Sequence, residues 1–309
     1  MDARSAKAMF DSLHIALSDA VAAARAVAEQ NTAWERPAAA GLAGRELAAE
    51  EARRPAPGTG SWPWLGAARI AHGALWVMIE EAQSLPVLVK PGVTSYAADA
   101  VCRAVLEAGS LAWWLLDPGI DAARRTARFL LYRLQSAKEN GKVVGALGLD
   151  PDEDLPEYGE TVESVLHEIS NLGWSVPETK QGKKNLKKII FDGQEERWLN
   201  YTDWAADLVT RIWPQGELPY RQLSAVAHAG LYGLMRNLAV STHDGSVLRP
   251  TPAEAAIWLW QDIYLVAGAL VLTADRAVRL LGTQEQTAQL EALVGNLQHT
   301  LDALRPPVA

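Results

Sequence analysis

The segment from Tyr220 to Arg236 carries the residues of this chain that are best suited to chemistry. Arg221 and His228 are seven residues apart, close to two helical turns, so both point to the same side, and Ser224 lies between them on that face. A guanidinium can stabilise phosphoryl charge, and an imidazole can move a proton. We therefore take Arg221, Ser224 and His228 as candidate catalytic residues.

Small side chains accompany this polar face. Ala225, Ala229, Gly230 and Gly233 would let another backbone approach closely. We therefore expect self-association through helix faces, giving a homo-oligomer.

The spacing Arg221-x6-His228 resembles the Arg-x4-6-His motif of the HEPN superfamily, a group of helical proteins that includes metal-independent ribonucleases and abortive-infection factors. The resemblance implies a helical protein of the defence or toxin type whose Arg-His pair is completed across a dimer and cuts RNA. A second match runs from Arg236 to His243, with Asn237 directly after the arginine. The run from Ser241 to Gly245 around that histidine is, however, typical of a helix end that enters a turn.

A broader pattern is similar to a group of uncharacterised all-α proteins common in actinomycetes. It is carried by Arg103-x3-Glu107, Trp113–Pro118, Arg124-Arg125-x2-Arg128 and Leu223–His228. The similarity implies that Arg103, Glu107, Arg124 and Arg128 gather near the candidate catalytic residues and bind an anion. The alternatives are an i,i+4 surface pair for Arg103–Glu107, a solvated basic face for the other arginines, and a core histidine for His228.

Five lysines fall within nine residues of this otherwise acidic chain: Lys180, Lys183, Lys184, Lys187 and Lys188. Such a local positive field typically attracts phosphate backbones or acidic partners. We therefore add Lys183, Lys184 and Lys187 to the candidate anion-binding residues, with RNA or an acidic protein as the expected partner. The alternative is a solvated loop.

Metal sites have weaker support in the sequence. Glu163 and His167 are one helical turn apart, but no second half of a di-iron motif accompanies them. The acidic run from Asp150 to Asp154 suits Mg²⁺ and suggests an isoprenoid-type cyclase as a lesser alternative, although the flanking prolines place it on a loop. We expect no metal and no cofactor.

Hydrophobic periodicity is helical nearly throughout and predicts an all-α fold, a multi-helix bundle of about eight to nine helices. Helices are predicted at 5–31, 64–84, 95–116, 117–139, 160–171, 198–213, 217–240, 252–281 and 283–304. An irregular or hairpin insertion is expected near 174–195, with the turn at Asp192-Gly193. We divide the chain into an N-terminal helix with a mobile connector (1–60, the connector at 37–60) and a helical bundle domain (61–309).

Composition limits the class of protein. The chain has 309 residues, a formal charge of −8 and one cysteine, Cys102, which fits a reducing cytoplasm. The stretch from Ala255 to Ala274 is long enough to span a bilayer, but Asp262 near its middle favours a buried core helix, so we expect no membrane association. The main alternative to a ribonuclease is a non-catalytic helical scaffold or ligand-binding protein.

Overall fold

The computed structural model shows an all-α protein. The described residues form nine helices and two short antiparallel hairpins. The residues that the structure describes are 3–29, 34, 37, 41–52, 63–88, 96–148, 161–213, 218–227, 239–240, 247–248, 252–282, 288, 292, 295 and 299. The predicted fold class, a multi-helix bundle with a hairpin insertion near 174–195, is confirmed.

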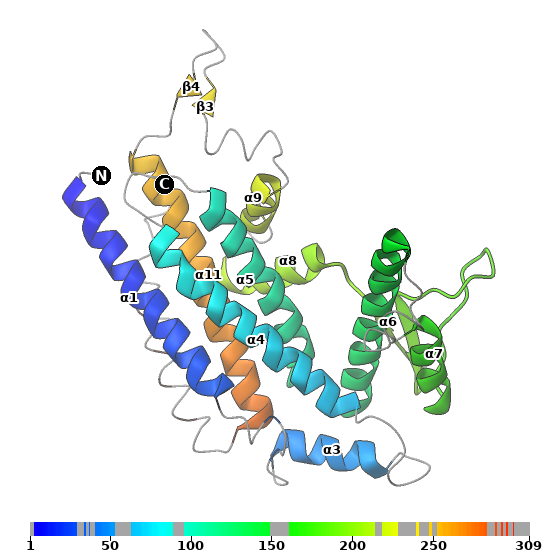
Figure 1. The fold of residues 1–309 in the computed structure, drawn as a ribbon. Helices are drawn as coiled ribbons and strands as arrows, with labels where there is room; N and C mark the ends of the chain where they lie inside the picture. The colour runs from blue at the N-terminus through cyan, green and yellow to red at the C-terminus, as the bar shows by residue number, and fades with distance from the viewer. Residues whose placement is uncertain are drawn as a thin grey trace.

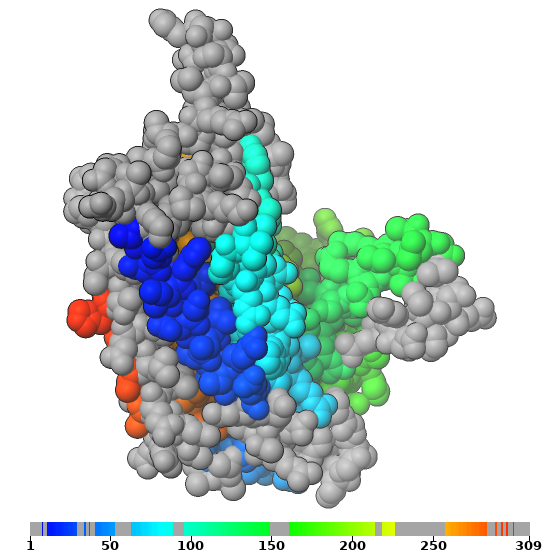
Figure 2. All heavy atoms as spheres, turned by 60° about the vertical axis from the view of Figure 1, so that its left-hand side comes forward, coloured from blue at the N-terminus to red at the C-terminus, as the bar shows by residue number. Residues whose placement is uncertain are grey.

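Four long helices form the main body of the bundle (Figure 1). They are α1 (Ala3–Ala28), α4 (Pro63–Leu88), α5 (Tyr96–Leu115) and α11 (Pro252–Leu281). Helix α4 packs against α1 and α5, and α11 packs against the same two helices from the other side. Figure 2 shows α1 and α4 side by side on one face of the molecule. The apolar stripe of each helix faces its neighbours, so the four helices share one core.

Helix α11 is the core helix that the sequence predicted at 252–281. Among the described helices, its segment Ile257–Leu281 is the one that is long and apolar enough to cross a membrane, and 78% of an 18-residue apolar stretch within it is buried inside the protein. Asp262 is 1% exposed and interacts with another group of the protein. This agrees with the expectation that a carboxylate at the centre of a core helix needs a partner.

A helix also occupies part of the segment in which we expected a mobile connector. Helix α3 (Leu42–Ala52) packs against α4, α6 (Ala122–Leu147) and α11. The buried side chains of α3 include two carboxylates, Glu46 and Glu50. Ion pairs and hydrogen bonds, rather than a wide apolar stripe, hold this helix against its neighbours. Hydrophobic periodicity in the sequence therefore did not reveal it.

The start of α6 corrects a second prediction. Asp117-Pro118 was expected to begin this helix, but its N-cap is Asp121, whose Oδ1 accepts a hydrogen bond from the Arg124 amide at 2.8 Å. The carboxylate of Asp117 instead accepts from the Gly119 amide at 3.0 Å within the preceding turn. Both aspartates have the residue type that caps helices, and the tertiary fold selects the second.

The predicted hairpin forms as expected. Strands β1 (Lys188–Phe191) and β2 (Gln194–Arg197) pair antiparallel. Asp192 and Gly193, which connect them, have φ angles of 47° and 75°. Two consecutive left-handed residues are typical of the tight turn that Asp-Gly favours.

Three shorter helices complete the part of the fold that bears on function. They are α7 (Val162–Asn171), α8 (Tyr201–Ile212) and α9 (Leu218–Ala227), and both α8 and α9 pack against α5. The predicted helix at 217–240 is wrong at its end, because Ala239–Val240 is strand β3 and pairs with β4 (Val247–Leu248). Most of the predicted helix at 283–304 lies outside the described residues.

Candidate functional site

Helix α9 carries two of the three candidate catalytic residues. Arg221 is exposed and Ser224 is half-buried, and their spacing of three residues places them on one side of the helix. The opposite side, which includes Tyr220 and Leu223, is buried. The amphipathic pattern of this short helix therefore turns Arg221 toward solvent.

Glu107 of α5 anchors the start of α9. Its Oε1 accepts a hydrogen bond from the Tyr220 hydroxyl at 2.8 Å and another from Nε of Arg103 at 2.7 Å. Arg103 and Glu107 thus form the i,i+4 pair expected from their spacing. Because Tyr220 directly precedes Arg221, this pair adjoins the helix that carries the candidate catalytic residues.

The tyrosine in this anchor is a stable neutral donor. Burial, followed by the hydrogen bond to Glu107, raises the pKa of Tyr220 to about 12. A smaller and opposite effect on this pKa comes from Thr202, near the start of α8. The phenol therefore keeps its proton at neutral pH and joins α9 to α5.

Arg124 and Arg128, the other arginines predicted to bind an anion, meet carboxylates of the protein itself. Nε of Arg124 lies 3.1 Å from Glu196 Oε2, and Nε of Arg128 lies 3.3 Å from Glu196 Oε1. Arg128 is also 3.6 Å from Asp117 Oδ2. Burial raises the pKa of Glu196 despite the opposing pull of both arginines, and burial lowers the pKa of Arg128. The predicted anion-binding arginines thus occupy two places, one beside α9 and one beside β2.

Arg125, which lies between these arginines in the sequence, is the centre of a buried network that the sequence did not predict. Its side chain is 1% exposed and donates to Glu46, with Nε–Oε2 at 2.8 Å and Nη2–Oε1 at 3.1 Å. It also donates to the carbonyls of Leu115 and Asp117. Glu46 accepts a further hydrogen bond from Trp64 Nε1 at 2.7 Å. The position of Arg125 on the apolar face of α6 was the available signal.

The lysine-rich segment lies at the surface before and within β1. Lys183 and Lys184 are exposed, and Lys184 pairs with Glu178 at 3.3 Å. Lys188 pairs with Glu195 at 3.2 Å. Lys187 is exposed and lines a pocket beside α6. The five lysines therefore have different surroundings, and two of them are partly balanced by carboxylates.

Several predicted features lie outside the described residues. They are His228, the second Arg-His pair at Arg236 and His243, and the acidic run from Asp150 to Asp154. Within the part of the chain that the structure describes, no group of three or more His, Cys, Asp or Glu side chains is placed to hold a metal ion.

Comparison with known proteins adds no assignment. No family model, no curated protein and no solved structure matches this chain. The functional conclusion therefore rests on the residues and their geometry.

Proposed function

We propose that this chain is a HEPN-like helical protein of the defence or toxin type that acts on RNA at the exposed face of α9. The observation that carries the proposal is the orientation of Arg221, exposed on a helix whose opposite side is fixed by Tyr220 and Glu107. A guanidinium held near the surface by a rigid helix can meet a phosphate without a large loss of backbone freedom.

In this proposal the reaction uses the 2′-hydroxyl of RNA as the nucleophile. His228 accepts the proton of that hydroxyl while its oxygen forms a bond to the adjacent phosphorus. The bond from phosphorus to the 5′-oxygen breaks, and a proton returns to that leaving oxygen. Arg221 stabilises the charge that develops on the non-bridging phosphate oxygens, with Ser224 as a hydrogen-bond donor beside it. The products are a 2′,3′-cyclic phosphate and a 5′-hydroxyl, and no metal takes part.

The other candidate arginines have structural roles in this proposal. Arg103, Arg124 and Arg128 each pair with a carboxylate of the described chain. We assign Arg103 and Glu107 the role of holding α9 in position. Direct contact with the RNA phosphate belongs, in this proposal, to Arg221.

Self-association is part of the same proposal. The small residues that follow Ser224 suit close packing of a second copy, and the resemblance places such a site at a dimer. Analytical ultracentrifugation of the purified chain at physiological salt concentration tests self-association, and a monomer would contradict it.

A non-catalytic helical scaffold or ligand-binding protein is the second candidate. It is favoured because many charged side chains pair with other groups of the protein, as in the network of Arg125, Glu46 and Trp64. In that case His228 holds the fold together and does not move protons.

The decisive experiment is RNA cleavage by purified protein in the presence of a chelator. We expect Arg221→Ala and His228→Ala each to lower the cleavage rate at least 100-fold while the thermal midpoint stays unchanged, because removing a group that stabilises transition-state charge or moves a proton costs 10²-fold or more. Arg69→Ala is the matched control, since Arg69 is an exposed arginine on the remote helix α4.

Two results would contradict the nuclease proposal. One is wild-type protein that leaves RNA intact without added metal. The other is a combined result in which His228→Ala is less stable than the wild type and all three variants cleave RNA at the same rate as the wild type. Either result favours the scaffold or ligand-binding protein.

A further inference from the structure

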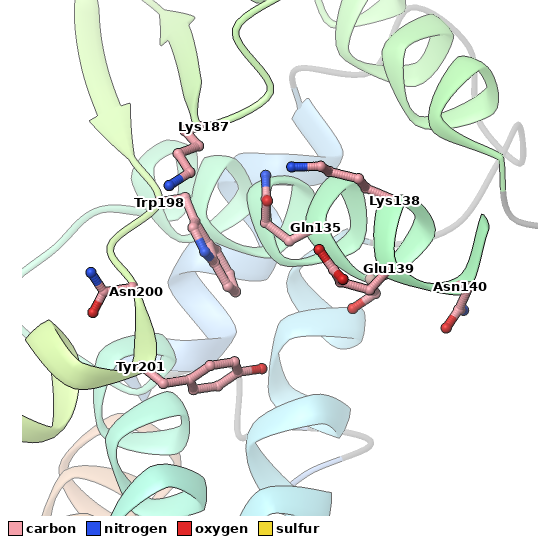
Figure 3. A pocket seen from close by; sticks show the side chains of 9 residues that line it. Gln135, Lys138, Glu139, Asn140, Lys187, Trp198, Asn200 and Tyr201 are labelled. Atoms are coloured by element: carbon pink, nitrogen blue, oxygen red, sulfur yellow. The ribbon is translucent and has the colours of Figure 1, made fainter. Parts of the chain in front are cut away.

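A pocket of about 450 Å³ opens beside α6, where the chain leaves β2 and enters α8 (Figure 3). Its lining includes Gln135 and Lys138 of α6, Lys187 before β1, and Trp198, Asn200 and Tyr201 between β2 and α8. The volume is within the range that binds small molecules in proteins. The pocket therefore has room for a ligand of the size of a mononucleotide.

One side of this pocket is aromatic and fixed. Trp198 is half-buried, and its ring meets Trp204 edge-on with centroids 4.3 Å apart. Tyr201 lies edge-on to both tryptophans, at 6.1 Å and 5.5 Å. In Figure 3 the indole of Trp198 lies between Lys187 and Tyr201, across from Gln135. Because three rings brace one another, a flat ligand meets a preorganised aromatic wall.

The pocket also carries positive charge. Lys138 and Lys187 are both exposed, and neither forms an ion pair with a carboxylate of the described residues. Glu139 is the acidic residue of the lining; it pairs with Lys142 at 2.7 Å, and Lys142 first and then Lys138 lower its pKa. With Lys138, Lys142 and Lys187 beside one carboxylate, positive charge exceeds negative charge at the pocket.

Gln135 ties the backbone next to Lys187 to the helix that carries Lys138. Its side-chain nitrogen donates to the carbonyl of Leu186 at 2.7 Å, which ties the residue before Lys187 to α6. Lys138 follows Gln135 by three residues on the same side of α6. The hydrogen bond leaves the amide oxygen of Gln135 as an acceptor at the pocket.

We propose that this pocket binds a nucleotide, with the base against Trp198 and Tyr201 and the phosphate between Lys138 and Lys187. Every base has a face that packs on aromatic rings, and an attached phosphate pairs with ammonium groups. The amide oxygen of Gln135 accepts from the edge of the base. The ligand is either a free mononucleotide or an exposed nucleotide of an RNA chain. This site is separate from the one proposed on α9 and does not depend on RNA cleavage.

Calorimetric titration with 5′-AMP tests the proposal, with adenosine and inorganic phosphate as half-ligands. We expect AMP to bind at least tenfold more tightly than either half, because both the aromatic wall and the lysines contribute. Lys187→Gln and Lys138→Gln should each weaken AMP binding about fivefold. Lys180→Gln, an exposed lysine outside the lining, should change it less than twofold.

The aromatic wall needs its own variant. Trp198→Leu should weaken AMP binding about tenfold, and far-ultraviolet circular dichroism shows whether the variant is folded. If Trp198→Leu does not fold, the Lys138→Gln and Lys187→Gln variants test the pocket, because they replace exposed side chains and should fold normally.

A single-stranded RNA oligonucleotide distinguishes the two sources of the nucleotide. Competition of the oligonucleotide with AMP supports an RNA chain as the natural ligand, and binding of AMP without competition supports a free nucleotide. Absence of AMP binding, equal affinity for AMP and adenosine, or equal loss in Lys180→Gln and Lys187→Gln would overturn the pocket.

Discussion

The buried pair of Arg125 and Glu46 offers the sharpest test of how this fold is held together. Arg125→Met keeps a long apolar stem but removes the guanidinium. Glu46 then loses both hydrogen bonds from Arg125 and keeps the one from Trp64, while the carbonyls of Leu115 and Asp117 lose a donor. A carboxylate that is 6% exposed is left without its counter-charge.

The expected cost follows from this loss. Breaking a buried ion pair by removing one partner destabilises a protein by about 3–5 kcal/mol, because the remaining charge stays out of water. We therefore expect Arg125→Met to lower the free energy of unfolding by about that amount. Equilibrium urea denaturation followed by far-ultraviolet circular dichroism measures it, provided that the unfolding slope is unchanged.

The double variant separates charge from packing. Glu46→Gln removes the uncompensated charge and keeps an acceptor for Trp64, so Glu46→Gln/Arg125→Met should recover about 1–3 kcal/mol relative to Arg125→Met alone. The matched control is the pair of Glu139 and Lys142, whose distance of 2.7 Å is close to the 2.8 Å of the buried pair but whose side chains are about 60% exposed. Lys142→Met should leave the denaturation midpoint unchanged.

Two results would refute this reasoning. The first is an Arg125→Met variant whose unfolding free energy is within about 1 kcal/mol of the wild type, which would mean that water reaches Glu46 easily. The second is strict additivity in the double variant, because additivity means that the two side chains do not interact.

Two further predictions concern α4 and the anchor of α9. Because the pKa of Tyr220 is raised from 10.0 to about 12, its neutral form stabilises the fold below pH 10, and that contribution is lost as the pH rises toward 12. The gap in unfolding free energy between the wild type and Tyr220→Phe should shrink by about 1 kcal/mol across this window after allowance for solvent screening, and a constant gap would contradict it. Gly66→Ala should destabilise the protein by about 1–3 kcal/mol, because an added Cβ would lie 2.2 Å from Cζ of Phe129. Gly73→Ala on the same helix meets nothing within 4 Å and should stabilise it by up to about 1 kcal/mol, so thermal melts that rank the two variants alike would refute the contrast.

Local patterns predicted the parts of the fold that local physics determines. The turn at Asp192-Gly193 follows from the left-handed conformation that these residue types tolerate, and the bounds of α11 follow from Pro252 and a long apolar run. Helix α3 was missed because Glu46 and Glu50 take the place of apolar side chains on its buried face. Its packing depends on Arg125, 79 residues away in the sequence, and no local pattern contains that pairing.

The candidate site shows the same division. The pair of Arg103 and Glu107 could be predicted from its i,i+4 spacing. Its role beside α9 could not, because Tyr220 is 113 residues from Glu107. Lys187 was an anion-binding candidate because of its lysine-rich segment, but its position beside Trp198 could not be predicted, since the pocket exists only where α6 packs beside the hairpin.

Arginine and lysine side chains have different roles in α6 and beside the hairpin. Arg125 and Arg128 donate hydrogen bonds to carboxylates through planar groups at fixed angles, and this geometry suits permanent contacts. Arg124 forms an ion pair with Glu196 and donates a hydrogen bond to the side-chain oxygen of Gln194. Lys138 and Lys187 carry compact charges on flexible stems beside an aromatic wall, and such charges follow a ligand as it enters and leaves. In a chain of net charge −8, an anion is drawn only to places where positive charge exceeds the local carboxylates. The arginines of α6 are largely neutralised by their partners, so the attraction near this helix comes from the two lysines, and nucleotide binding there should weaken as salt is added.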